Sequence, residues 1–166
     1  MKPDAAKLVV FQLGIDLFAA DVLSVERVLR YTPPNSVPDV PAWVEGVLEH
    51  RGQVIPVVDM RRRIELAEAS ITPETRILVL NTSGGWVGAI VDAVHEVSST
   101  SGGGVAPPPP LFRGLAAEFI QGIGRVRDQL VVVLNVDRVL STTDRLVFEQ
   151  AVAANAGPAG QPAGRG

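Results

Sequence analysis

One stretch of this chain returns later without a gap. Residues Pro41 to Ile64 align with Ala117 to Leu140, an offset of 76 from Trp43 to Phe119. The identical pairs are Gly46/Gly122, Arg51/Arg127, Gln53/Gln129, Val57/Val133 and Arg62/Arg138. A gapless repeat of this length predicts two copies of one structural unit, with a binding site between them.

The preceding sequence extends the repeat. Lys7–Val28 aligns with Arg76–Val97 at an offset of 69, from Val25 to Val94. Because the offset grows from 69 to 76 along the chain, the second copy holds seven more residues. We place them in the Gly- and Pro-rich run Ser101–Pro110.

Most segments have the composition of β-strands, because short runs rich in Val and Ile are bounded by turn residues. The predicted strands are 9–13, 17–19, 53–60, 76–81, 87–91 and 130–136. Pro56 predicts an edge strand or a bulge, since proline donates no ladder hydrogen bond. Segment 130–136 is apolar except for Asn135 and predicts a strand covered on both faces. Asp21–Val28 suits either a helical turn or a strand.

Few helices are expected. Ala42–Leu48 is compatible with a short helical turn after Pro41, and Ser141–Asp144 has the pattern of a capping box before a helix to about Ala154. Residues 155–166 are mostly Gly, Pro and Ala, which predicts a disordered tail. The chain therefore divides into a domain at 1–154 and a tail at 155–166. Short strands repeated twice predict two small β-barrels packed together.

Composition removes several classes of function. The chain has 166 residues, 46% of them hydrophobic, a net charge of −3 and no cysteine. The small charge gives no case for binding nucleic acid or a membrane surface, and the missing cysteines exclude disulfides and thiolate metal sites. The start of the chain has no secretory signal and no apolar run is long enough to span a membrane. We expect a cytoplasmic protein.

Candidates for catalysis are sparse. His50 and His95 have no metal-ligand spacing, so surface positions are expected for both. Asp59 and Asp92 each follow an apolar strand, and one carboxylate in each copy resembles a catalytic carboxylate dyad. They occupy different positions in the two repeats, however. We interpret them as strand-end carboxylates that bind turn amides. Arg61–Arg63 is interpreted as a solvated turn.

Arg51-Gly52 is the more informative motif. It puts a planar set of donors at a tight bend, where glycine allows another backbone to approach. Arg51 is therefore either an interface anchor or a structural arginine that binds loop carbonyls.

With these residues in view, the chain resembles the CheW-type coupling proteins. The central motif is GVLEHRGQVIPVVDMR, Gly46–Arg61, and four further blocks resemble the family in the same order. These blocks are LVVFQLG at 8–14, TRILVLN at 75–81, VGAIVDAVHEV at 87–97 and GIGRVRDQLVVVLNVDRVL at 122–140. The resemblance covers about residues 7–146.

The resemblance implies a mainly β fold of two intertwined five-stranded SH3-like barrels that share a core, with few helices. It implies an adaptor that is not an enzyme and needs no cofactor or metal. The implied partners are the tip of a methyl-accepting chemoreceptor and the regulatory domain of a CheA-type histidine kinase, with no nucleic acid and no membrane insertion. The implied location is the cytoplasm, at membrane receptor arrays.

The receptor site implied by this resemblance comprises Val25, Arg27, Val28, Gly46 and Arg51. The kinase-binding residues are not assigned. Two departures fall on the expected receptor surface: Glu49-His50 replaces Asn-Leu, and Arg27 stands where an acid is common. They suggest a different receptor, and a scaffold of a non-flagellar chemosensory pathway is the alternative function. An acid hydrolase based on Asp59 is a third, disfavoured alternative.

Overall fold

A computed structural model describes residues 7–63, 70–100, 104–107, 118–140 and 142–155. Within these residues, ten strands form two five-stranded sheets, sheet A in the order β8-β1-β2-β10-β9 and sheet B in the order β3-β6-β7-β5-β4. The strands of the first copy are β1 (Lys7–Leu13), β2 (Asp16–Asp21), β3 (Val25–Arg30), β4 (Val44–His50) and β5 (Gln53–Asp59). Those of the second copy are β6 (Arg76–Thr82), β7 (Gly85–Val91), β8 (Ala93–Ser99), β9 (Ile120–Val126) and β10 (Gln129–Leu134).

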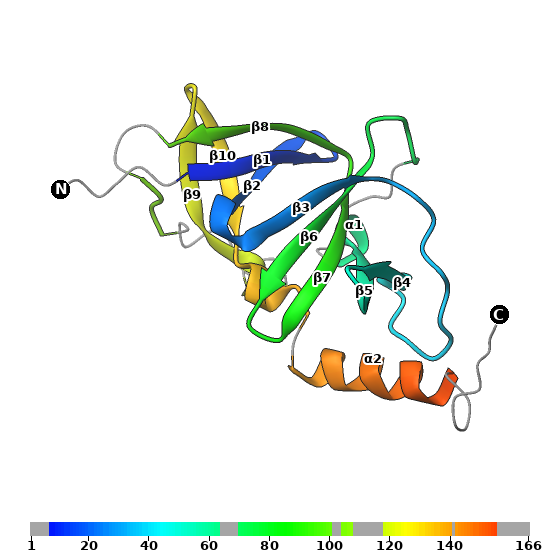
Figure 1. Ribbon diagram of the computed structural model, residues 1–166. Helices are drawn as coiled ribbons and strands as arrows, with labels where there is room; N and C mark the ends of the chain where they lie inside the picture. The colour runs from blue at the N-terminus through cyan, green and yellow to red at the C-terminus, as the bar shows by residue number, and fades with distance from the viewer. Residues whose placement is uncertain (1–6, 64–69, 101–103, 108–117, 141, 156–166) are drawn as a thin grey trace.

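The two copies of the repeat exchange strands. Sheet A takes β1 and β2 from the first copy and β8, β9 and β10 from the second, whereas sheet B takes the remainder. Figure 1 shows this exchange as a mixture of early and late colours in each sheet. Strands related by the repeat occupy equivalent places in the two sheets. The predicted mainly β class and the intertwined arrangement are confirmed.

The repeated glycines have a structural reason. A Cβ atom on Gly46 would fall on the carbonyl oxygen of Asn35, and one on Gly122 would fall on that of Ala106. These close approaches occur because Asn35 and Ala106 each form a β-bridge beside the glycine, to Val47 and to Ile123 respectively. The same contact is therefore built once in each half.

Apolar side chains form three clusters. The largest joins the facing surfaces of both sheets and includes Phe11, Leu78, Leu80 and Phe119. A second lies within sheet A and a third within sheet B. Because this cluster takes residues from both sheets, each sheet buries the apolar side chains of its outer face, the face turned toward the other sheet, only against that other sheet.

One ion pair of each sheet joins its two opposite edges. In sheet B, Glu26 of edge strand β3 forms an ion pair of 3.5 Å with Arg51, in the turn before β5. In sheet A, Glu96 of edge strand β8 pairs with Arg127 at 3.2 Å. Such contacts between opposite edges are consistent with the barrels that the sequence predicted.

The helical turn expected at Ala42–Leu48 is wrong, because β4 covers Val44–His50. Tertiary pairing with β5 overrides the local signal. The expectation for Pro56 is also wrong, since β5 lies inside sheet B and its register is continuous at Pro56. Val47, opposite Pro56, bonds through its own N–H and carbonyl to Asn35, and pairing with β7 begins only at Val57. The proline nitrogen is therefore not needed in the ladder.

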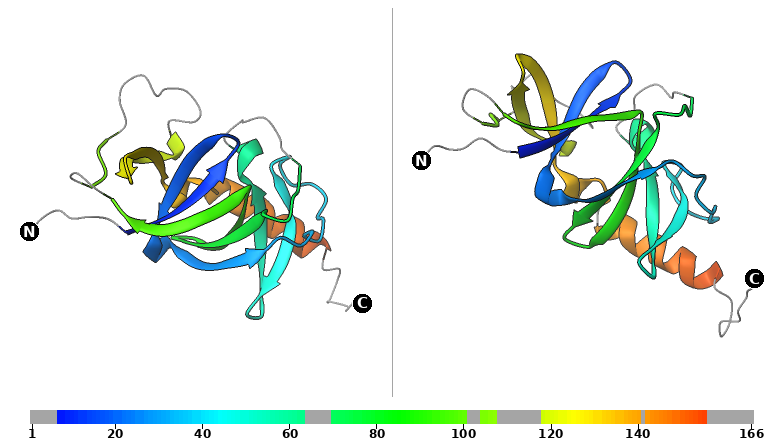
Figure 2. Two further views of the ribbon diagram at one scale, coloured as in Figure 1. Left: turned by 90° about the horizontal axis from the view of Figure 1, so that it is seen from above. Right: turned by 45° about the horizontal axis from the view of Figure 1, so that its top comes forward.

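Other expectations are confirmed in part. Asp21–Val28 contains both alternatives, a 3₁₀ helix η1 (Val22–Ser24) followed by β3. β10 is covered on both faces from Val131 to Leu134, as predicted, whereas Leu130 near its start is 61% exposed. The last helix, α2 (Thr142–Asn155), is where the sequence placed one. It lies on the side of the molecule away from β8 in Figure 1 and in the right-hand view of Figure 2. The predicted tail after Asn155, the cap residue Ser141 and most of Ser101–Pro110 lie outside the described residues.

Candidate functional site

The structure brings together two of the residues assigned to receptor binding and separates a third. In β3, Val25 is paired with Leu80 and Val28 with Leu78, so both valines lie on the outer face, which continues into the shared core. Arg27 is paired with Val79 and lies on the opposite face of the strand. A bulge between Val25 and Arg27 produces this separation.

Arg51 and Gly52 form the two-residue turn between β4 and β5. Their φ angles are 52° and 80°, and at Arg127 and Asp128 in the second copy they are 51° and 65°. Two successive positive φ angles define the turn that matches the twist of a hairpin. Since arginine rarely adopts this conformation, both copies hold an arginine where glycine or asparagine is usual. The Arg51 side chain is 60% exposed, whereas Gly46 is buried.

A histidine that was expected on the surface lies buried beside this turn. His50 is only 8% exposed and its ring meets Trp86 edge-on at a centroid distance of 4.9 Å. Among the described residues its Nε2 has no hydrogen-bond partner, and it lies 3.8 Å from Glu26 Oε2. The Trp86 indole donates a hydrogen bond to Asn81 Oδ1 at 2.7 Å. Glu26 and Trp86 were missed from the sequence, because no local motif marks either residue.

The equivalent region of sheet A is open. Leu17 and Val126 stand there in place of Trp86 and His50, and they line a depression of about 490 Å³. His95, exposed as expected, lies at its rim within 3.0 Å of Gln12 Oε1. The two halves therefore differ in the side chains that fill these equivalent regions.

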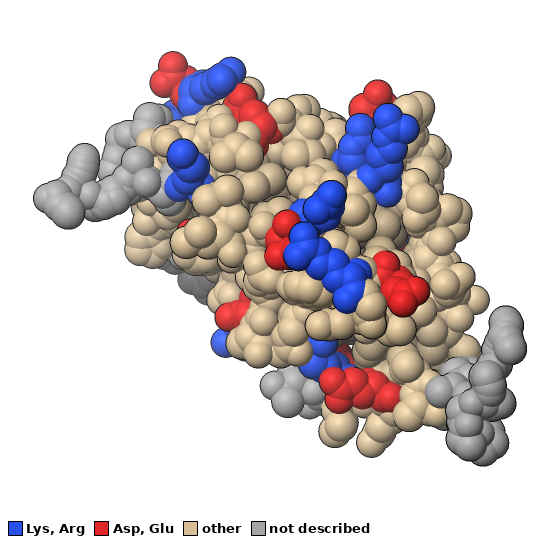
Figure 3. Space-filling view, viewed as in Figure 1, with Lys and Arg blue, Asp and Glu red and all other residues tan. Residues whose placement is uncertain are grey.

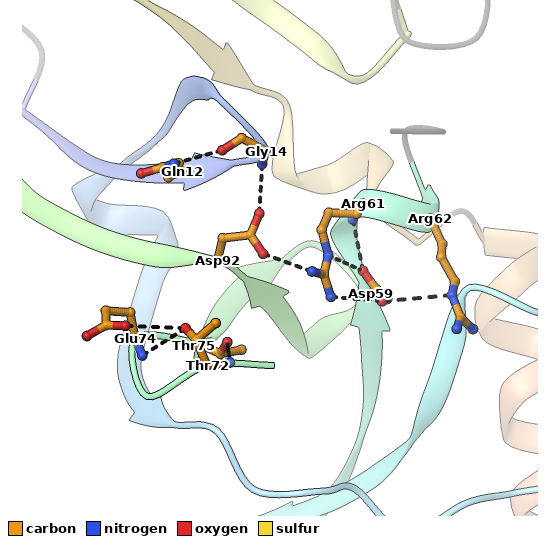
Figure 4. Close-up of polar contacts among 9 residues, drawn as sticks. All are labelled: Gln12, Gly14, Asp59, Arg61, Arg62, Thr72, Glu74, Thr75 and Asp92. Carbon is orange, nitrogen blue, oxygen red and sulfur yellow. Dashed lines mark hydrogen bonds and ion pairs between the residues drawn. The ribbon is translucent and has the colours of Figure 1, made fainter. Parts of the chain in front are cut away.

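Asp59 and Asp92 do not form a catalytic dyad. Arg61 lies between them, with Nε 3.3 Å from Asp59 Oδ1 and Nη1 2.9 Å from Asp92 Oδ1 (Figure 4). Asp59 also accepts a hydrogen bond from the Arg61 amide, and Asp92 accepts one from the Gly14 amide at 2.7 Å. The interpretation as carboxylates that bind turn amides is confirmed.

The expectation of a solvated turn at Arg61–Arg63 is wrong. These residues belong to a short helix, α1 (Met60–Arg63), and Arg61 is 2% exposed. The partner that makes this burial possible, Asp92, lies in the other copy of the repeat, so the arginine run alone could not reveal it.

Arg63 joins the two copies. Its guanidinium lies 4.0 Å from the ring centroid of Trp43 and 4.7 Å from that of Phe119, and Phe119 is the repeat partner of Trp43. It donates to the Val139 carbonyl at 2.8 Å and pairs with Asp144 of α2 at 3.2 Å. Burial lowers the pKa of Arg63, and the Asp144 carboxylate opposes that change.

Neither a metal centre nor a membrane span is found in the part of the chain that the structure describes. Within it, His, Cys, Asp and Glu side chains form no group of three or more that could hold a metal ion. None of the described helices has the length and apolarity needed to cross a bilayer.

The structure is that of a mainly β protein built from two five-stranded sheets. The sequence model of the CheW-like domain matches residues 7–144. The chain therefore belongs to the CheW-like family, a family of scaffold and adaptor proteins.

Individual relatives agree. The chain is 30% identical over 142 residues to "Chemotaxis protein CheW" of Treponema pallidum (strain Nichols), covering 83% of this chain and 84% of the relative. It is 32% identical over 133 residues to "Protein FrzA" of Myxococcus xanthus, covering 79% of each. The crystal structure of the scaffolding protein TtCheW from Thermoanaerobacter tengcongensis matches with a TM-score of 0.78 at 28% identity, over 85% of this chain and 96% of that one.

Proposed function

We propose that this protein is a chemotaxis adaptor that couples the cytoplasmic tips of chemoreceptors to a CheA-type histidine kinase. The observation that carries the proposal is the CheW-like match over residues 7–144. It is supported by exposed Val28 on the outer face of β3 and exposed Arg51 at the β4–β5 turn. Residues 1–154 would act as the adaptor domain, in the cytoplasm at receptor arrays.

The five residues assigned to the receptor have different roles in this proposal. Val25 and Val28 offer an apolar strip, and Arg51 offers exposed donors beside it. Arg27 is exposed on the opposite face of β3, where it offers a second positive charge to a partner. Gly46 acts indirectly, because it lets the segment at Asn35 approach β4.

An adaptor acts by changing the conformational equilibrium of the kinase, through contacts with two partners at once, rather than by catalysis. Each contact can be weak, since many copies in an array raise the effective affinity. The proposed mechanism therefore uses neither a cofactor nor a metal, and it requires a ternary complex of receptor, adaptor and kinase.

Arg51→Ala tests the receptor surface. We expect a folded protein that loses about 1–3 kcal/mol of binding free energy for a receptor fragment, as for an interface anchor. Arg127→Ala is the matched control, since Arg127 has the same backbone conformation and a similar ion pair. Binding of purified receptor hairpins, measured by calorimetry, separates the two variants. An equal loss in both would show that Arg51 serves the turn rather than the receptor.

A scaffold of a non-flagellar chemosensory pathway is the alternative. The departures at Arg27 and Glu49 favour it, because both side chains are exposed, whereas His50 is buried and would act only through the packing beneath this surface. Titration of the protein against receptor hairpins from the same genome tests this alternative. Equal affinity for all of them would count against it, and no ternary complex with any CheA-type kinase would refute the proposal as a whole.

A further inference from the structure

Two arginines face each other across neighbouring strands of sheet B. Arg30 at the end of β3 is the register partner of Arg76 at the start of β6. Cross-strand partners lie on the same face of a sheet, and like charges there are destabilising. Among the described residues, neither arginine forms an ion pair. The nearest acid along the chain, Glu74, bonds to the Thr72 hydroxyl instead.

The pair borders a depression. Its volume is about 350 Å³, and its lining includes Arg30, Tyr31, Ile71, Thr72 and Arg76. Arg76 Nη1 donates to the carbonyls of Pro73 at 2.7 Å and Thr75 at 3.0 Å, which holds its guanidinium in place. Figure 3 shows Lys and Arg side chains gathered where β3 crosses the face of the molecule in Figure 1, with acidic side chains at the margins.

An apolar contact lies beside this cationic one. Val28 is 42% exposed and shares the outer face of β3 with Arg30. Two residues along a strand span about 7 Å. Four residues along a helix rise about 6 Å. A helical partner could therefore touch Val28 and Arg30 with side chains one turn apart.

The fold does not require the arginine pair. In sheet A the equivalent register partners are Lys7 and Ser99, which carry a single positive charge. Sheet A therefore forms without a second cation at the equivalent place, and the fold alone does not account for the arginine pair in sheet B.

We propose that the partner segment lying along β3 presents a carboxylate to Arg30 and Arg76, and an apolar side chain one helical turn away to Val28. This inference rests on the proposed function, because it takes a helical receptor hairpin as the partner. Two arginines at paired positions on one face suit a carboxylate, whose oxygens can accept hydrogen bonds from both guanidiniums. The carboxylate would also relieve the like-charge contact.

Charge reversal tests the proposal. The probes are purified chemoreceptor cytoplasmic hairpins from the same genome, chosen to carry an apolar residue followed four positions later by Asp or Glu. We expect Arg30→Glu to weaken binding at least tenfold and to reduce its dependence on salt. Lys7→Glu makes the same charge change at the equivalent place in sheet A and should leave the affinity within twofold. Thermal unfolding of Arg30→Glu should occur no lower than in the parent protein, since it replaces a like-charge pair with an opposite one.

A hairpin in which Lys replaces the acidic residue should regain affinity for Arg30→Glu. The proposal is overturned if the parent protein binds a hairpin and Arg30→Glu binds it equally well, or if Lys7→Glu weakens binding as much. Absence of binding by the parent protein to every hairpin and kinase would instead refute the proposed function.

Discussion

Replacement of Arg61 by Met should destabilise the fold, because Arg61 joins carboxylates from the two copies of the repeat. Arg61 lies between Asp59 and Asp92, at 3.3 Å and 2.9 Å. Methionine retains much of the side-chain volume but leaves both carboxylates without their shared cation. Removal of one partner from a buried ion pair is destabilising by about 3–5 kcal/mol. We expect a loss in that range, a large fraction of the stability of an ordinary domain.

Urea unfolding followed by the fluorescence of the two tryptophans provides the assay. With a typical denaturant dependence, a loss of this size moves the midpoint by roughly 2 M. Arg62→Met is the control, because that side chain is 40% exposed and pairs mainly with Glu45 at 3.1 Å, with a longer contact of 3.9 Å to Asp59. Its replacement should lower stability by about 1 kcal/mol or less.

A triple variant separates charge from packing. Arg61→Met combined with Asp59→Asn and Asp92→Asn removes all three charges while the amide oxygens can still accept the backbone hydrogen bonds. Asn135, the repeat partner of Asp59, already does so, accepting from the Asp137 amide at 3.2 Å. The triple variant should recover most of the lost stability. If Arg61→Met cost less than about 1 kcal/mol, or if the triple variant were no more stable than Arg61→Met, the reasoning would be refuted.

Three further outcomes are expected. Gly46→Ala and Gly122→Ala should each destabilise the fold by about 2 kcal/mol or more, because the new Cβ meets a backbone carbonyl oxygen; urea midpoints at the parent value would contradict this. Tyr31, the single tyrosine, should ionise above its ordinary pKa of 10.0 in an absorbance titration at 295 nm, because burial and two nearby carboxylates raise that pKa. Stability should fall as pH rises through the raised pKa, and Tyr31→Phe should remove that alkaline loss. Arg63→Lys should lose about 1 kcal/mol, because an ammonium group cannot stack on Trp43 as the guanidinium does; an unchanged unfolding temperature would argue against that contact.

The repeat made the fold class predictable, because a gapless alignment carries strand positions from one half to the other. It did not determine which copy pairs with which. A pair such as β1 and β2 is local, whereas the parallel contact of β5 with β7 joins residues 57–59 to 88–90. That exchange of strands came from the family resemblance, since pairing within one copy satisfies the same apolar pattern.

Local signals failed where distant contacts decide. Ala42–Leu48 suits a helical turn by composition, but β5 supplies a hydrogen-bonded partner. Pro56 predicts an edge strand or a bulge, but Val47 of β4, opposite Pro56, bonds to Asn35 instead and so does not need the proline nitrogen. The bulge that places Arg27 on the opposite face from Val25 has no marker in the sequence. Strand positions were therefore more predictable than the direction in which a site residue points.

Comparison of the two halves separates folding from recognition. A residue kept in both copies at the same backbone conformation satisfies a requirement of the shared unit, as the close approaches at Gly46 and Gly122 show. By this argument the presence of arginine at both 51 and 127 favours a role in the turn. Arg30 faces Arg76, whereas the equivalent pair in the other half is Ser99 and Lys7, so the shared unit does not require an arginine at position 30. The Arg51→Ala and Arg127→Ala pair therefore tests a position that the two halves share, whereas the Arg30→Glu and Lys7→Glu pair tests one at which they differ. Specific loss at Arg51 would mean that one copy of a structural turn has acquired a partner, and specific loss at Arg30 would mean that recognition lies where the halves have diverged.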